Sequence, residues 1–207
     1  MTREMVNARS GYIGTVELTD HMGDELKVAN AARLCRNGHK DVMDASSERL
    51  INFLLREKHL SVFEHCVMTF AIRCPIFVRT HLFRYRTASV TEWSHRGVDK
   101  DPSIWAPDTE NGETMHEMYS KCIAMYKLLL EKGMPAEQAR AILPQGMFTN
   151  FLYTIDLRNF MHIWEERSAP SAQEETRSIV RAMAKQANEF YPIVGKYFNW
   201  NQEEKEN

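Results

Sequence analysis

The chain has 207 residues, a length that suits a single domain able to bury its own core without disulfides or metal ions. Its 26 basic and 28 acidic residues give a formal net charge of −2, which argues against a protein that coats nucleic acid or an anionic membrane. Hydrophobic residues make up 43% and charged residues 26%, which excludes a wholly disordered chain. No run approaches the roughly 18 apolar residues of a membrane helix, and no secretory signal is visible, so we expect a cytoplasmic protein.

Periodicity predicts helices and strands in the first half. The segment 46–58 is the stronger helix, because its apolar residues recur at helical spacing after Ser and Asp residues that suit a cap. Residues 66–74 alternate, with Cys66, Met68, Phe70 and Ile72 on one face, which is typical of a half-buried strand. The elements expected here are a short strand at 12–18, helices at 26–34 and 46–58, a strand at 66–74, a helix from Pro75 to about Thr87, and a turn at 88–96.

The second half is predicted to be helical. After a loop at 97–114, methionines and tyrosines repeat at three and four residues up to Gly133, which predicts a helix with these side chains in the core. Further helices are expected at 135–142, at 157–165, and from a capping box of Ser171 and Glu174 to about Tyr191. With its few strands in the first half, the chain is expected to be one α+β domain over residues 1–207.

The four cysteines do not indicate a metal site. Cys35, Cys66, Cys74 and Cys122 have no CxxC spacing, and the eight histidines form no HExxH pattern, so we expect no bound metal. Because free Cys is among the most buried residue types, we expect Cys66, Cys74 and Cys122 to be core thiols.

Positive charge concentrates between residues 79 and 96. Four arginines and two histidines lie there with a single acid, Glu92. Guanidinium groups bind phosphate and polarised carbonyls, and a cluster of them is costly unless anions neutralise it. If 76–87 is helical, Arg79 and Arg86 share one face and His81 and Arg84 another, so one helix could bind two anionic groups.

Three more arginines, Arg140, Arg158 and Arg167, lie in apolar helical sequence. A single arginine is most often a solvated residue paired with acids such as Glu165 and Glu166. The cluster at 84–96 is harder to explain in that way.

Residues 84–97 read RYRTASVTEWSHRG and resemble the signature of the flavin-dependent thymidylate synthases: RHR, two residues, S, one residue, NE, one residue, S, one residue, RY. Both outer arginines, both serines, the glutamate and the last arginine match. The segments AARLC at 31–35, LSVFEH at 60–65, PIFVR at 75–79, EQARAILP at 137–144 and the region 154–167 also look like family segments in the right order.

The resemblance implies a small, mainly antiparallel sheet with several long helices, and a homotetramer whose subunits share active sites. It implies FAD as cofactor, NADPH and methylenetetrahydrofolate as co-substrates, and a uridine nucleotide as substrate; no nucleic acid polymer or membrane is expected as partner. Around the nucleotide it places His81, Arg84, Glu92, Ser94, His95, Arg96, Arg140 and Arg167. Around the flavin it places Ser61, Glu64, Arg84, Tyr85, Arg86, Thr87, Thr91, Glu92, Arg158 and His162.

The expected reaction is reductive methylation of uridylate at uracil C5, from dUMP to dTMP. C5 attacks a one-carbon unit only if charge developing on the ring is met by preorganised donors, and Arg167 is the candidate for that catalytic role. No cysteine falls at a recognisable nucleophile position, consistent with electrostatic activation.

The sequence departs from the family pattern around the sugar, base and flavin. Tyr85 replaces the central His, Thr91 the Asn, His95 a Gly and Gly97 the final Tyr. His81 stands for an upstream Gln and Asp156 for the Asn ahead of Arg158, while a His after Arg167 corresponds to Ser171 or to nothing.

Three alternatives remain open. One is a UMP C5-methylase of nucleoside-antibiotic biosynthesis in the same family. Another is a non-catalytic protein that binds flavin or nucleotide. An RNA-binding module is weakly supported, because no RRM, KH or zinc-knuckle pattern accompanies the basic stretch.

Overall fold

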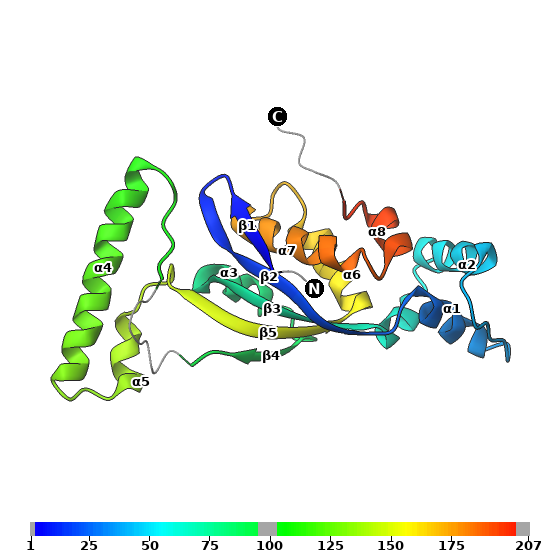
Figure 1. The fold of residues 1–207 in the computed structure, drawn as a ribbon, viewed down its shortest axis with the longest axis horizontal. Helices are drawn as coiled ribbons and strands as arrows, with labels where there is room; N and C mark the ends of the chain where they lie inside the picture. Colours follow the sequence, from blue (N-terminus) through cyan, green and yellow to red (C-terminus); the bar gives the residue numbers. More distant parts are fainter. Residues whose placement is uncertain (1–2, 95–102, 202–207) are drawn as a thin grey trace.

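The computed structural model describes residues 3–94 and 103–201, and these form a five-stranded antiparallel sheet with helices (Figure 1). The strand order is β1-β2-β3-β5-β4. The strands are β1 (Glu4–Ala8), β2 (Gly11–Met22), β3 (Val67–Pro75), β4 (Ser89–Glu92) and β5 (Phe148–Asp156). The helices are α1 (Glu25–Leu34), α2 (Ala45–Arg56), α3 (Ile76–Leu82), α4 (Glu110–Glu131), α5 (Ala136–Ala139), α6 (Leu157–Arg167), α7 (Glu174–Ala187) and α8 (Pro192–Phe198), with 3-10 turns η1 (Leu60–His65) and η3 (Arg140–Ile142). The α+β class and the antiparallel sheet are thus confirmed.

The central strand β3 shows why one face of the sheet is covered. Met68, Phe70 and Ile72 are almost fully buried, whereas the residues between them are half-buried. Because successive strand side chains point to opposite faces, this alternation sends the apolar set toward the helices. Phe70 pairs in register with Tyr153 of β5, which is buried on the same face. The predicted alternation at 66–74 is therefore confirmed.

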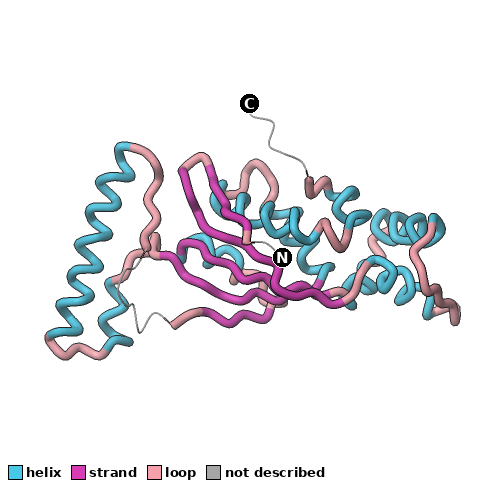
Figure 2. The backbone as a smooth tube through the Cα atoms, in the orientation of Figure 1, coloured by secondary structure: helices cyan, strands magenta, loops and turns pink. Residues whose placement is uncertain are grey.

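The helical layer packs on that face. Helix α7 contacts β1 and β2, α3 contacts β3 and β5, and α6 contacts β5, with Phe160 of α6 packed against Phe70 of β3. Figure 2 shows these helices beside the long curved strands. Phe160 and Ile163 of α6 and Ile179 and Met183 of α7 are fully buried, so the core lies between this layer and the sheet.

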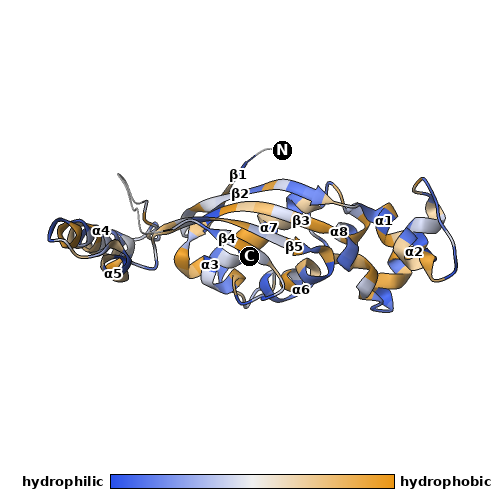
Figure 3. Cartoon of the chain, turned by 90° about the horizontal axis from the view of Figure 1, so that it is seen from below, coloured by the Kyte–Doolittle hydropathy of each residue, from blue (hydrophilic) through white to orange (hydrophobic). Residues whose placement is uncertain are grey.

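Helix α4 lies at one end of the molecule, beside α5 and apart from the sheet, as Figures 1 and 3 show from two directions. Only Gly112 and Tyr126 of its 22 residues are buried. Met115, Met118 and Met125 are 36%, 53% and 43% exposed. The expectation that the methionine stripe belongs to the core is wrong within one chain, because helical spacing predicts an apolar face but not what covers it.

The basic segment differs most from expectation. Helix α3 ends at Leu82, so the predicted helix to Thr87 and the face-sharing of its arginines are wrong. Residues 89–92 form strand β4 where a turn was expected, because they pair with β5 in register, from Ser89 with Thr154 to Glu92 with Phe151. Pairing with a strand distant in sequence decides this conformation.

Several smaller expectations are also corrected. Strand β2 extends beyond 12–18, β1 was not expected, and β5 places a strand in the second half. No side chain caps α7; its N-cap residue is Gln173, so the capping box of Ser171 and Glu174 is wrong. That helix ends at Ala187, and α8 follows from Pro192. The bounds of α1, α2 and α6 lie within two residues of the expected helices, and Asp44 caps α2 through Ser47 N.

Cys66 and Cys74 are buried thiols as expected, but Cys122 on α4 is half-exposed. Within the described ranges, no helix combines the length and apolar character needed to cross a bilayer.

Candidate active site

Helix α6 exposes a row of polar side chains between the sheet and solvent. Asp156 caps the helix by accepting a hydrogen bond from Asn159 N at 2.9 Å, so the residue that departs from the family Asn still performs a local structural role. Arg158, His162 and Glu166 follow at intervals of four and therefore share one exposed face. Arg167, at the last position of the helix, is half-buried.

Tyr85 joins the end of this row. Its hydroxyl donates to Glu166 Oε2 at 2.6 Å and accepts from Arg167 Nε at 2.7 Å. The Arg167 guanidinium carbon lies 5.4 Å from the centroid of the Tyr85 ring, and the His162 ring meets that ring edge-on at 5.9 Å. His162 Nε2 is 3.6 Å from Glu166 Oε1. These four side chains form the Tyr85 cluster.

The electrostatics of the Tyr85 cluster fix its proton positions. Burial, followed by the bond to Glu166, raises the pKa of Tyr85 to about 12. The same hydrogen bond is the main cause that lowers the pKa of Glu166. At neutral pH the phenol is therefore protonated and the carboxylate ionised.

His81 lies next to this cluster, on α3. Its Nδ1 is 3.0 Å from Thr176 Oγ1 of α7. Burial, then the charge of Arg167, then that of Arg84, lowers the pKa of His81. A neutral imidazole therefore lies in the field of two guanidinium groups, where it can hydrogen-bond a ligand without adding charge.

At the other end of the row, Arg158 pairs with Glu64 of η1. Ser61 is three residues before Glu64, and residues three apart lie on one side of a 3-10 turn. Four residues expected at the flavin thus lie along one side of α6, where Glu64 meets Arg158 and Tyr85 meets His162. Ser61, also expected there, is on η1, which packs against α6.

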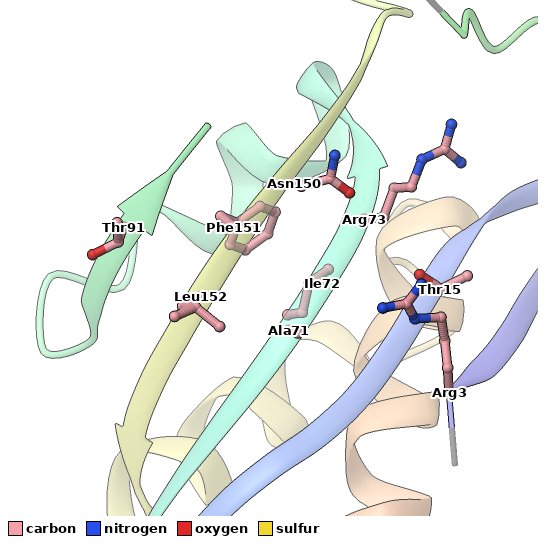
Figure 4. Close-up of a pocket in the computed structure, with 9 residues that line it drawn as sticks. All are labelled: Arg3, Thr15, Ala71, Ile72, Arg73, Thr91, Asn150, Phe151 and Leu152. Carbon is pink, nitrogen blue, oxygen red and sulfur yellow. The ribbon is translucent and has the colours of Figure 1, made fainter. Parts of the chain in front are cut away.

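Thr91 and Glu92 face opposite sides of the sheet. Glu92 Oε1 lies 2.9 Å from Arg79 Nε and accepts from Thr149 Oγ1 at 2.8 Å, on the helical side. Thr91 lines a hollow of about 370 Å³ on the other face, with Arg73 and Asn150 (Figure 4). Because neighbouring strand residues alternate, one flavin cannot contact both side chains from one face of this chain.

The remaining expected residues lie elsewhere. Arg140 is exposed on η3, which packs against α4 and α5, away from the Tyr85 cluster. Arg86 and Thr87 are exposed in the turn before β4, and Ser94 is exposed just after it. His95 and Arg96 lie outside the described residues.

Sequence reasoning missed Arg79, Thr176 and the role of Glu166 in this region. The sequence indicates Arg79 only as part of a charge cluster, yet its guanidinium carbon lies 4.8 Å from the centroid of the Phe83 ring and its Nε pairs with Glu92. Glu166 carried one available signal, its spacing of four from His162. Thr176 reaches His81 only through tertiary packing, 95 residues along the chain.

The donor set along α6 fits a flavin nucleotide. Arg158 offers a fork of donors for phosphate, Ser61 a hydroxyl, and Tyr85 and His162 flat rings beside which an aromatic group can pack. At the α3 end, Arg84, Arg167 and neutral His81 offer donors for an anionic, hydrogen-bonding ligand.

Comparison with known proteins gives the family. Residues 17–193 match the Thy1 family, described as thymidylate synthase complementing protein. Two relatives named flavin-dependent thymidylate synthase come from Pseudothermotoga lettingae, 35% identical over 83% of each chain, and from Thermus thermophilus, 34% identical over 89% of this chain and 75% of the relative.

A solved structure is also similar along nearly the whole length. The UMP/dUMP methylase PolB from Streptomyces cacaoi, bound with 5-Br dUMP, superposes with a TM-score of 0.84 at 28% identity over 94% of this chain and 97% of that one. The same methylase bound with 5-Br UMP gives a TM-score of 0.79 at 26% identity, over 95% and 98%. The chain belongs to the Thy1 family of thymidylate synthase complementing proteins, which includes the flavin-dependent thymidylate synthases.

Proposed function

We propose that this chain is an FAD-dependent methyltransferase that reductively methylates uridylate at uracil C5. Methylenetetrahydrofolate supplies the carbon and NADPH the reducing equivalents. The observation that carries the proposal is Arg167, fixed by Tyr85 beside Arg84 and a neutral His81, at one end of a polar row suited to a flavin nucleotide. Relatives named for this activity support it.

The site residues have different proposed roles, set by the chemistry of their side chains. Arg158, Ser61, Tyr85 and His162 would hold FAD, which supplies hydride chemistry when it is bound. Arg167 donates to the uracil oxygen or N3 on which charge develops as C5 attacks the one-carbon unit. The Arg84 fork binds the nucleotide phosphate.

UMP is the second candidate substrate. The methylase PolB, named for both UMP and dUMP, was solved with a brominated analogue of each. His81 and His95 replace family residues at the expected nucleotide site, so we expect the pocket of this chain to differ in shape from that of its relatives. Parallel assays with dUMP and UMP, with methylenetetrahydrofolate and NADPH supplied, test the proposal and choose between the substrates. Purified protein that is colourless and does not bind added FAD would refute the proposed function and favour the alternative of a non-catalytic binding protein.

The proposal includes a homotetramer with shared active sites. Arg140, expected at the nucleotide, lies on η3 beside α4 and α5, at the opposite side of the sheet's end from α6 and Arg167, so a second copy has to bring it there. The exposed methionines of α4 offer an apolar surface for such a contact. The open sheet face, where Thr91, Arg73 and Leu152 are accessible, offers another (Figure 4). A monomeric mass from light scattering, for protein that is active, would contradict the proposed homotetramer.

The proposal also treats residues 1–207 as one domain in the cytoplasm. All four cysteines are free thiols, which suits a reducing compartment.

A further inference from the structure

Tyr85 stands where the family signature has a histidine, and its hydroxyl touches the arginine expected at uracil. We propose that Tyr85 is the positioning residue for Arg167: its hydroxyl, anchored by Glu166, sets the direction in which the guanidinium presents its terminal donors. The inference rests on the proposed function for what those donors meet. The positioning itself is a property of this chain.

The direction of the two hydrogen bonds is forced by chemistry. Arginine can only donate and an ionised carboxylate can only accept. The Tyr85 oxygen, 2.7 Å from Arg167 Nε and 2.6 Å from Glu166 Oε2, must therefore accept from the first and donate to the second. A phenylalanine at this position would lose both bonds while keeping the ring.

Arg167 is the last residue of α6, so no following helical turn restricts its side chain and a contact from outside the helix has to orient it. The Tyr85 ring lies 5.4 Å from its guanidinium carbon, and the hydroxyl bonds Nε. Ring and hydroxyl together restrict both the plane and the rotation of the guanidinium. In the part of the chain that the structure describes, no hydrogen bond engages the two Nη atoms, so they are the donors left for a ligand.

Tyr85 is itself held from three sides. Its amide donates to Leu82 O at 3.1 Å at the end of α3, and its carbonyl accepts from Ala88 N at 3.4 Å. The His162 ring packs against its edge. Because the ring is held in place, its hydroxyl has a defined position, and an arginine that is hydrogen-bonded to this hydroxyl is preorganised before substrate binds.

The charges around the cluster explain why an anchor is useful. Arg167 and Arg84 both lower the pKa of His81, so this region carries positive charge that tends to push the Arg167 guanidinium away unless a contact holds it. Glu166 is the acid in contact with the hydroxyl, and His162 also faces it at 3.6 Å. The neutral phenol thus bridges the Glu166 carboxylate and Arg167 Nε, and the two Nη atoms of Arg167 remain for the ligand.

The test separates positioning from turnover. In ¹⁵N-labelled protein with FAD bound, the Arg167 Nε–H resonance is identified by its loss in Arg167→Lys, and its exchange with water is compared with that in Tyr85→Phe. The matched control is Tyr197→Phe, which removes the same atom from an exposed ring on α8. We expect faster exchange and a shifted resonance in Tyr85→Phe only, with FAD still bound.

Steady-state kinetics supply the second measurement, with whichever uridylate wild type converts. We expect kcat of Tyr85→Phe to fall about 10-fold or more, as for the loss of a charged hydrogen bond, with KM changed less than about 3-fold. Glu166→Gln, which still accepts from the phenol, should fall between Tyr85→Phe and wild type. An unchanged Nε–H resonance, or a kcat equal to that of Tyr197→Phe, would overturn the inference. Wild type that turns over neither nucleotide would refute the proposed function, while the resonance still decides the positioning.

Discussion

Glu25 gives a pH dependence of stability that follows from its place in the fold. Its side chain is buried, and Oε1 accepts from Ile193 N at 2.6 Å and Val194 N at 3.0 Å, which ties α1 to the start of α8. Burial is the largest cause that raises the pKa of Glu25 to about 7, against the opposing effect of these two bonds. Asp24 and Glu48 raise it further.

The sign follows from proton binding. Between pH 4.5 and 7 the folded chain holds a proton on Glu25 that the unfolded chain has released, so the free energy of unfolding falls as pH rises through this window. At roughly 1.4 kcal/mol per pH unit the full effect is about 3.5 kcal/mol, of which about 2.5 kcal/mol is lost between pH 5 and 8.

Urea unfolding followed by circular dichroism measures this difference. Glu25→Gln keeps an oxygen that can accept from both amides but cannot ionise, so it should lack this loss. We expect the wild type to lose about 2.5 kcal/mol more than the variant between pH 5 and 8. Glu137→Gln, at an exposed position on α5, is the control and should follow the wild type. Equal losses in wild type and Glu25→Gln would refute the reasoning.

Three further predictions test the site and the assembly. Arg167→Ala should lower kcat about 100-fold with an unchanged circular dichroism spectrum, because a preorganised charge donor is lost; unchanged turnover would remove Arg167 from the mechanism. Arg79→Ala should cost about 1–3 kcal/mol in urea unfolding, since the Arg79 and Glu92 side chains are only 21% and 22% exposed, and a loss near zero would show that this pair does not hold β4 against α3. Met118→Glu should lower the mass measured by light scattering, because a charge on the exposed α4 face opposes apolar contact; an unchanged tetramer would exclude that face from the interface.

Local chemistry in the sequence was enough to predict several elements. The alternation in β3 and the periodicity of α2 and α6 identify these segments without knowledge of their neighbours, because each buries one face of a regular element. The motif at 84–97 likewise identified the family, since its residue types and spacing are specific.

Strand pairing could not be predicted in the same way. Strand β5 acquires its partners from residues 67–75 and 89–92, far away in sequence, so its hydrogen bonds are invisible to any local window. The same pairing ends the helix expected to reach Thr87 and turns Thr91 and Glu92 to opposite faces.

By itself the sequence determined which residue types are available and at what spacing: the clustered arginines, the tyrosine that replaces a histidine, and the apolar stripe of α4. Only the tertiary structure decided which side chains these residues contact. It joined Tyr85 to Glu166 and Arg167 across 81 and 82 residues, and it left Met118 and Arg140 away from the sheet. The physical reason is that residue type and local spacing set what a side chain can bind, whereas long-range packing sets which groups come within hydrogen-bonding distance.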